Sequence, residues 1–219
     1  MKVLKTTHTV TLKGQQLTLY PEKIIYWQDK KVLICADLHL GKVKHFRKEG
    51  IALPHKAEKE VLKRLGEIIE KIQPEKVLFL GDLFHSSRNL GWIHFNDFIE
   101  RFTHTSFMLV VGNHDILDDD NYKESKLKIV DGYLESGPFI FSHEPLEEVL
   151  EGKYNLCGHI HPAVVLRGKA RQRIKLPCFY FGDHTGILPA FGTFTGTGII
   201  NPQKGEKVFV IAQGKVLAV

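Results

Sequence analysis

The sequence predicts a single layered α/β domain with two sheets, spanning residues 1–219. In the first half, short apolar runs alternate with segments whose apolar residues recur at helical spacing, which is typical of crossover units and a largely parallel sheet. The second half contains short strand-like runs separated by turn residues. The length suits one well-packed domain, and no linker, repeat or low-complexity tract divides the chain.

The first half begins with strands and continues in alternation. From Thr9 the apolar and polar residues alternate as in half-buried strands, and Lys13-Gly14-Gln15 is a hairpin turn. An apolar run predicts a buried strand over 32–35, and the spacing of the following apolar residues predicts a helix over 55–72. The next predicted elements are a strand, a helix and a strand, over residues 76–80, 92–102 and 107–111.

The second half is predicted to be mainly β. Apolar runs indicate strands over 139–141 and 154–157, and further strands in AVVLRG, RIKLPCFYFG and KVFVIAQGKVLAV. The segment LEEVLEG, residues 146–152, carries the last helical periodicity in the chain.

The composition is that of a globular protein, with 43% hydrophobic and 25% charged residues. No stretch approaches the roughly 18 apolar residues of a membrane span, so we expect a cytoplasmic protein with no membrane association. Cys35, Cys157 and Cys178 lie in apolar runs without the spacing of a zinc or redox motif, and are expected to be buried and reduced. The net charge of +5 mildly favours an anionic partner.

Polar residues with metal-binding or acid–base chemistry follow five of the predicted strands. Ligand sites in α/β sheets gather at the carboxyl ends of strands. The five groups are ADLHLGK with Asp37 and His39, GDLFH with Asp82 and His85, GNHD with Asn113, His114 and Asp115, SHEP with His143, and GHIHP with His159 and His161. A single Asp or His in such a position is commonly a turn or capping residue, but five groups together indicate one shared site.

Two of these groups repeat the same spacing. Asp37 and His39 stand two residues apart, as do His159 and His161 after Gly158. In an extended strand, side chains at i and i+2 lie on the same side, so each pair is expected to project together from its strand.

In this order, the five groups resemble the motifs of the calcineurin-like metallophosphoesterase superfamily. The resemblance implies a β-sandwich flanked by helices over nearly the whole chain. More narrowly, ADLHLGK, GDLFHS and the tail LPAFGTFTGTG resemble the ligase-associated DNA damage response endonucleases of bacteria and archaea. This narrower resemblance implies association with a DNA ligase or helicase.

The superfamily resemblance implies a site for two divalent metal ions. The first ion would be held by Asp37, His39, Asp82 and His161, and the second by Asp82, Asn113, His143 and His159, with Asp82 bridging. Nitrogen and oxygen donors without thiolate suit Mn²⁺, Fe²⁺ or Zn²⁺ better than Ca²⁺, and we favour Mn²⁺.

The same resemblance implies a phosphoesterase in which a metal-bridging hydroxide attacks phosphorus. His114 would be the general acid that protonates the leaving oxygen, and Asp115 would orient its imidazole and favour the charged form. His85 stays open between substrate contact, support of the metal ligands and a capping or loop role.

The substrate is less well defined than the chemistry. The basic stretches Lys42–Lys48 and Arg167–Lys175 flank the proposed site and favour a phosphodiesterase or endonuclease acting on DNA or nucleotides, although charge runs are usually solvated. One alternative is a phosphomonoesterase acting on a small molecule or a protein. The other is a binding scaffold that has lost catalysis, which the complete ligand set disfavours. The sequence shows no DNA-binding extension of the kind carried by the large nucleases of the superfamily. A partner or an oligomer is therefore left open as the source of further contacts with DNA.

Overall fold

The computed structural model describes residues 6–41, 56–84, 90–115, 125–168, 172–193 and 195–219. Within these ranges the chain forms two sheets, of seven and nine strands, and two α-helices. The order of elements confirms the predicted layered α/β fold with two sheets. That the whole chain is one domain stays a prediction.

The first sheet has the strand order β1-β2-β3-β4-β5-β6-β7. Neighbours from β1 to β4 pair antiparallel and those from β4 to β7 pair parallel. A 3₁₀ turn, η1 (Gln28–Lys30), precedes β4. The strands are β1 (His8–Leu12), β2 (Gln15–Tyr20), β3 (Ile24–Trp27), β4 (Val32–Cys35), β5 (Lys76–Leu80), β6 (Ser106–Val110) and β7 (Leu127–Val130).

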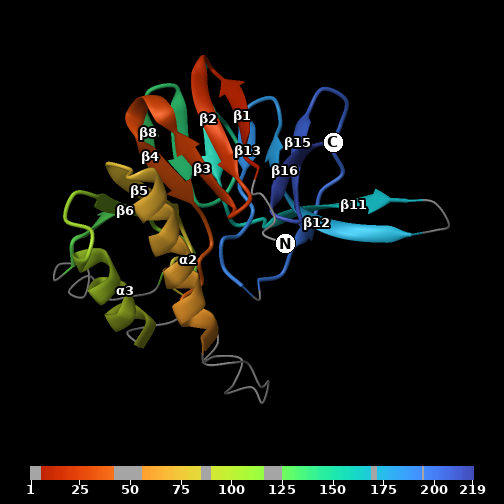
Figure 1. Cartoon of the computed structure of the whole chain (residues 1–219). Helices are drawn as coiled ribbons and strands as arrows, with labels where there is room; N and C mark the ends of the chain where they lie inside the picture. Colours follow the sequence, from red (N-terminus) through yellow and green to blue (C-terminus); the bar gives the residue numbers. More distant parts are fainter. Residues whose placement is uncertain (1–5, 42–55, 85–89, 116–124, 169–171, 194) are drawn as a thin grey trace.

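The helices α2 (Lys56–Ile72) and α3 (Leu90–Glu100) lie on the outer face of this sheet (Figure 1). Each follows one parallel strand and precedes the next, since parallel neighbours need a crossover connection. The apolar stripe of α2 packs with Phe79 and Phe107 of the sheet and with Phe95 of α3. This aromatic layer fixes the helices against the parallel strands.

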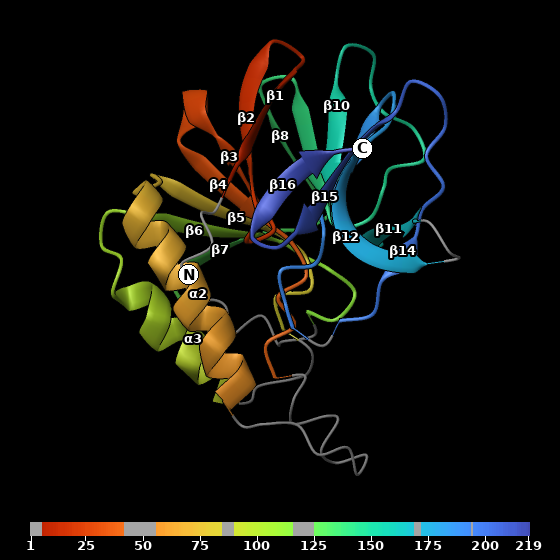
Figure 2. The same cartoon turned by 45° about the vertical axis from the view of Figure 1, so that its right-hand side comes forward.

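The second sheet has the order β14-β11-β12-β13-β10-β9-β8, with β15 pairing to β12 and β16 to β15 (Figure 2). β9, β10 and β13 run parallel to one another. The strands are β8 (Tyr133–Ser136), β9 (Phe139–Ser142), β10 (Tyr154–Cys157), β11 (Pro162–Arg167), β12 (Arg173–Phe181), β13 (Thr185–Ile187), β14 (Gly198–Ile199), β15 (Lys207–Ala212) and β16 (Lys215–Ala218).

The two sheets pack face to face through a second apolar core. Leu78 and Trp27 of the first sheet share this core with Phe139, Phe141 and Leu156 of the second. The Trp27 and Phe139 rings meet edge to face, with centroids 5.0 Å apart, an arrangement that aromatic pairs prefer. Because β4 and β5 bury side chains on both faces, their sequences are continuous apolar runs.

Most predicted elements of the first half are confirmed within one or two residues, and β4, β5 and β10 match their predicted bounds. The helix indicated by the periodicity of 146–152 is wrong. This segment contains bends and a turn, and the Leu146 amide donates to the Asn155 side chain at 3.1 Å. Only five residues, 146–150, separate Pro145 from the turn before β10, too few for a stable amphipathic helix.

The three cysteines are buried and form no disulfide, as predicted. Burial raises the pKa of each thiol, that of Cys178 to about 12, so these cysteines are inert at neutral pH. In the described part of the chain, no helix combines the length and the apolar character needed to cross a bilayer.

Candidate metal centre

The polar groups predicted at the five strand ends meet at one edge of the molecule, where β4, β5 and β6 of the first sheet and β9 and β10 of the second sheet end. Backbone hydrogen bonds fix the segments that follow these strands. The His39 amide donates to the Asp82 carbonyl at 2.9 Å, and the Gly158 amide donates to the His143 carbonyl at 2.9 Å. The Asp37 carboxylate joins the sheets, because both its oxygens lie within 3.2 Å of the His159 amide nitrogen.

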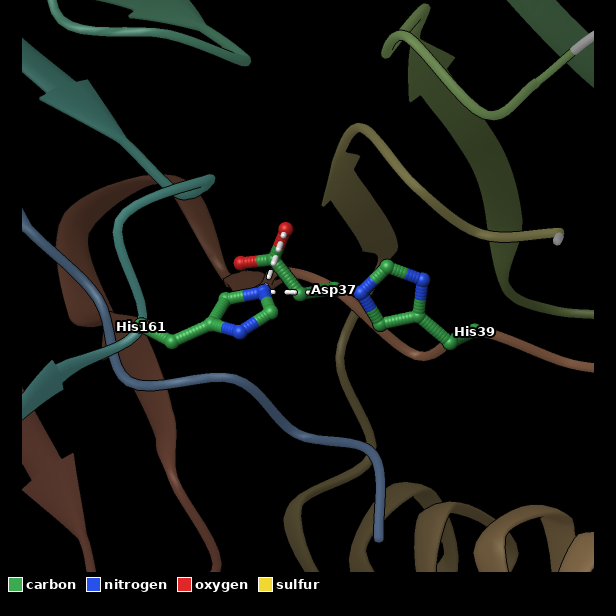
Figure 3. Close-up of side chains that lie close together, drawn as sticks. All are labelled: Asp37, His39 and His161. Carbon is green, nitrogen blue, oxygen red and sulfur yellow. Dashed lines mark hydrogen bonds and ion pairs between the residues drawn. The ribbon is translucent and has the colours of Figure 1, made fainter. Parts of the chain in front are cut away.

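A first cluster of donors consists of Asp37, His39 and His161 (Figure 3). Nε2 of His161 lies 3.4 Å from Oδ1 of Asp37 and 3.4 Å from Nε2 of His39. Asp37 is fully buried and His39 nearly so. The three side chains therefore direct one oxygen and two nitrogens to a single point, as the ligands of a metal ion must.

A second cluster consists of Asp37, Asp82 and His143, with His159 beside it. Nε2 of His143 lies 3.4 Å from Oδ1 of Asp82 and 3.1 Å from Nδ1 of His159. Asp82 also faces the first cluster, since its Oδ2 lies 3.8 Å from Nε2 of His39. The two oxygens of one buried carboxylate thus point to histidines of different clusters.

Backbone carbonyls orient two of the imidazoles. Nδ1 of His161 lies 3.0 Å from the Gly196 carbonyl oxygen, and Nδ1 of His143 lies 3.0 Å from the Leu80 carbonyl oxygen. A carbonyl only accepts, so Nδ1 is the donor in both rings, and Nε2 is the nitrogen left to bind a metal ion. Metal-binding histidines are held in the same way. The donor set therefore fits a metal ion in both clusters.

The local backbone differs from the extended strands that were expected. β4 ends at Cys35 and β10 at Cys157, and Asp37, His39, His159 and His161 have φ between 50° and 65°. The paired side chains converge because alternate residues adopt the left-handed conformation, which costs about 1–2 kcal/mol per residue. Hydrogen bonds from neighbouring segments hold this strained backbone at the site.

Two glycines of the motifs are required by close approach. A Cβ on Gly81 would lie 2.1 Å from Nδ1 of His143, and a Cβ on Gly158 would lie 2.7 Å from Oδ2 of Asp37. Neither distance is possible for real atoms, so any side chain would displace a candidate ligand. This explains why Gly158 precedes the paired histidines.

His114 and Asp115 lie at the same edge. The His114 amide donates to Oδ1 of Asp82 at 3.0 Å, and its ring meets that of His39 edge to face, with centroids 5.7 Å apart. Asp115 accepts hydrogen bonds at 2.9 Å from the amides of Phe84 and Gly112, one on each oxygen. Burial raises the pKa of the Asp115 carboxyl to about 7. Through these bonds Asp115 joins the loop after β5 to the loop after β6.

Glu144 was not identified from the sequence. Its Oε1 accepts a 2.7 Å hydrogen bond from Nδ2 of Asn113 and lies 3.8 Å from Nδ1 of His159. The bond from Asn113 holds the pKa of this exposed carboxyl below its usual range. Because the Asn113 amide nitrogen is engaged, its oxygen is the atom that can serve as a ligand. The Glu of SHEP was the available signal, but nothing in the sequence paired it with Asn113.

The tail after β13 was also not recognised as part of the site. The Phe191 amide donates to the Ala36 carbonyl at 2.8 Å, and the Gly192 amide donates to the Asp37 carbonyl at 3.0 Å. Arg64 of α2 donates to the Phe191 carbonyl, and its guanidinium lies 4.1 Å from the centre of the Phe191 ring. The tail therefore contacts two residues of the first cluster, Asp37 through the Gly192 amide and His161 through the Gly196 carbonyl.

Some predicted residues fall outside the described ranges. These are His85, the basic stretch Lys42–Lys48 and residues 169–171 of the second basic stretch. The seven predicted metal ligands, together with His114 and Asp115, all lie within the described ranges.

The model of the calcineurin-like phosphoesterases matches residues 30–185. The chain belongs to this family. A search of curated proteins found no match. Among solved structures, the nuclease MPE of Pseudomonas putida superposes with a TM-score of 0.82 at 29% identity, covering 98% of this chain and 100% of that one. This match fits the narrower resemblance to ligase-associated endonucleases. A phosphoesterase from E. coli, Yfce, shares 13% identity over 83% of this chain and 87% of its own, with a TM-score of 0.42.

Membership of the calcineurin-like phosphoesterase family assigns the chemistry at a coarse level. The family depends on two metal ions, and the two donor clusters supply candidate ligands for them. The protein is therefore a metal-dependent phosphoesterase, a hydrolase of phosphate esters. The matched range ends before Phe191 and Gly196, so the tail that braces the first cluster lies beyond it.

Proposed function

We propose that the protein is a Mn²⁺-dependent phosphodiesterase that cleaves DNA or nucleotides. The observation that carries the proposal is the Asp82 carboxylate, whose two oxygens face histidines of different clusters at 3.4 and 3.8 Å. A shared carboxylate is what a pair of neighbouring cations requires, because each oxygen can bind one ion.

The residues of the two clusters would act as ligands. The first ion would be held by Asp37, His39, Asp82 and His161, and the second by Asp82, Asn113, His143 and His159. When bound, the two ions would lower the pKa of a water molecule and neutralise charge on the phosphoryl oxygens. Nitrogen and oxygen donors without thiolate support Mn²⁺ as the metal, with Fe²⁺ and Zn²⁺ as alternatives.

His114 would donate a proton to the leaving oxygen. Its backbone is held against Asp82 at the site, while its side chain is exposed to an approaching ester. Asp115 would position His114 through the backbone of the GNHD loop, because both its oxygens accept backbone amides. Asp115 is thus proposed as a positioning residue.

The choice of a diester rests on two further observations. The Pseudomonas putida protein that superposes over 98% of this chain is a nuclease. The chain also has a net charge of +5, which favours binding of a polyanionic substrate. A DNA ligase or helicase partner, an oligomer and a cytoplasmic location stay predictions from the sequence.

The test is hydrolysis by metal-stripped protein refilled with Mn²⁺, using bis-p-nitrophenyl phosphate, p-nitrophenyl phosphate and a labelled DNA oligonucleotide. His114→Ala protein, purified in parallel, controls for a contaminating nuclease. The proposal predicts Mn²⁺-dependent cleavage of the diester and of DNA. Cleavage of the monoester alone would instead identify a phosphomonoesterase, and no cleavage of any substrate would favour a binding scaffold.

A further inference from the structure

The hairpin of β11 and β12 leaves the site directly. β11 begins at Pro162, the residue after the candidate ligand His161, and the hairpin projects from the rest of the second sheet (Figure 1). β14 pairs with β11 at the base of the hairpin, where Pro162 and Ala163 lie opposite Gly198 and Ile199. We call residues 162–167 and 173–177 the arm.

The two faces of the arm differ in character. Val164, Leu166 and Leu176 belong to an apolar cluster with Val208 of β15, so one face of the arm packs against side chains of a neighbouring strand in the same sheet. Side chains of opposed residues share a face, and the face alternates along the strand. The other face therefore carries the cations at the outer end of the arm.

The register brings these cations together. Arg167 pairs directly with Arg173, and Lys175, opposite Val165, lies on the same face. All three cationic residues are exposed. Like charges directly opposed on a sheet destabilise it, so the fold itself gains nothing from this arrangement.

No carboxylate within the described ranges forms an ion pair with Arg167, Arg173 or Lys175. Glu206 lines the same hollow as the two arginines. However, its Oε1 accepts from the Tyr180 hydroxyl at 2.5 Å and its Oε2 from the Gln203 amide at 2.6 Å. Both Glu206 oxygens are thus hydrogen-bonded to other groups, so within the described ranges no carboxylate is paired with the cationic face.

We infer that the arm binds the phosphodiester backbone of a nucleic acid whose scissile phosphate lies at the two clusters. At about 3.3 Å per residue, Lys175 lies roughly 13 Å from His161 along the arm and the arginine pair roughly 20 Å. In a duplex one strand advances about 3.4 Å per nucleotide, so the arm would contact phosphates about four to six nucleotides from the cleaved bond. This inference rests on the proposed function for the identity of the substrate.

The test compares Arg167→Gln/Arg173→Gln with the control Lys30→Gln/Lys71→Gln. The control removes the same charge from exposed positions before β4 and β5, at the end of the sheet away from the site. Binding of a fluorescent 30-base-pair duplex is measured by anisotropy on metal-free protein at 50 and 200 mM salt. Hydrolysis of that duplex and of bis-p-nitrophenyl phosphate is measured on Mn²⁺-loaded protein.

The arm variant is expected to bind DNA roughly tenfold more weakly than the control at 50 mM salt, with the difference nearly gone at 200 mM, because two phosphate contacts are lost. Its kcat/KM for DNA should fall similarly while hydrolysis of the small diester stays unchanged. Its melting temperature should equal or exceed that of the wild type.

Two results would overturn the inference. One is equal DNA binding by both variants, and the other is a loss of activity on the small diester equal to the loss on DNA. Because binding is measured without metal, a wild-type protein that binds DNA through the arm but hydrolyses no diester would refute the proposed function alone.

Discussion

Nε2 of His39 lies 3.4 Å from Nε2 of His161, although 122 residues separate the two histidines in the chain. His39 follows a strand of the first sheet and His161 a strand of the second, so their contact depends on the packing of the two sheets. The same packing places the Asp82 carboxylate between the clusters. The metal centre is therefore a property of the sandwich, and changes that shift one sheet against the other will affect it.

The proposed acid is tested by His114→Ala. This variant should retain its metal content and lose DNA cleavage by about 10²–10⁴-fold. It should lose less activity on bis-p-nitrophenyl phosphate, because the nitrophenolate leaves without protonation. Metal analysis and kcat on both substrates check this. Full DNA cleavage by the variant, or loss of metal with activity, would assign His114 another role.

The requirement for glycine at position 81 is tested with a matched control. Gly81 and Gly132 have nearly equal φ, +74° and +73°, but only at Gly81 would a Cβ meet an atom within 4 Å. Gly132→Ala should lower the free energy of unfolding by about 1 kcal/mol from the backbone alone. Gly81→Ala should lower it by about 2–4 kcal/mol and also displace His143. Denaturant unfolding and Mn²⁺ affinity are the measurements, and equal effects would show that the contact with His143 is unimportant.

The tail is tested through its anchor on α2. Arg64→Met removes the hydrogen bond to the Phe191 carbonyl and the contact with its ring. We expect Mn²⁺ affinity to fall about 10–100-fold, as for other residues that support metal ligands. Arg101→Met is the control, since that exposed guanidinium lies over Phe98 and Phe102 at 5.6 Å, away from the site. If Arg64→Met bound Mn²⁺ as tightly as the wild type, the tail would have no role in holding the metal ligands.

Lys23 gives a prediction for pH dependence. Burial, with the nearby Arg64, lowers the pKa of this amine to about 8. Between this value and the ordinary pKa of lysine the unfolded chain binds more protons, so stability rises with pH across that window. Lys23→Met should be more stable than wild type near pH 7, by up to roughly 3 kcal/mol, and the difference should shrink above pH 8. Urea unfolding at pH 7 and pH 10 checks this. A constant difference would show that the amine is not desolvated.

The strand ends were predicted well because buried parallel strands are continuous apolar runs. Each run ends at a definite residue and is followed by a short polar motif. Asp37, Asp82 and His143 could be assigned to one edge on this basis alone. The conformation at the edge was not predictable, since nothing in DLH or HIH distinguishes an extended strand from alternating left-handed residues.

Residues that act through long-range contacts were also missed. Glu144 meets Asn113 across 31 positions, and Arg64 meets Phe191 across 127. Such pairs are determined by how the sheets and α2 pack, and neither partner carries a local pattern. The basic arm was predicted as a charged stretch, but its paired arginines follow from the β11–β12 register.

The most direct measurement is the number of Mn²⁺ ions bound per chain in the wild type, His143→Ala and Asp82→Asn, with Asp97→Asn on the exposed face of α3 as the control. The account predicts two ions in the wild type and the control, one in His143→Ala, and the loss of both at moderate Mn²⁺ in Asp82→Asn, because that carboxylate serves both clusters. One ion in the wild type, or two ions retained in Asp82→Asn, would contradict a centre built on a shared carboxylate.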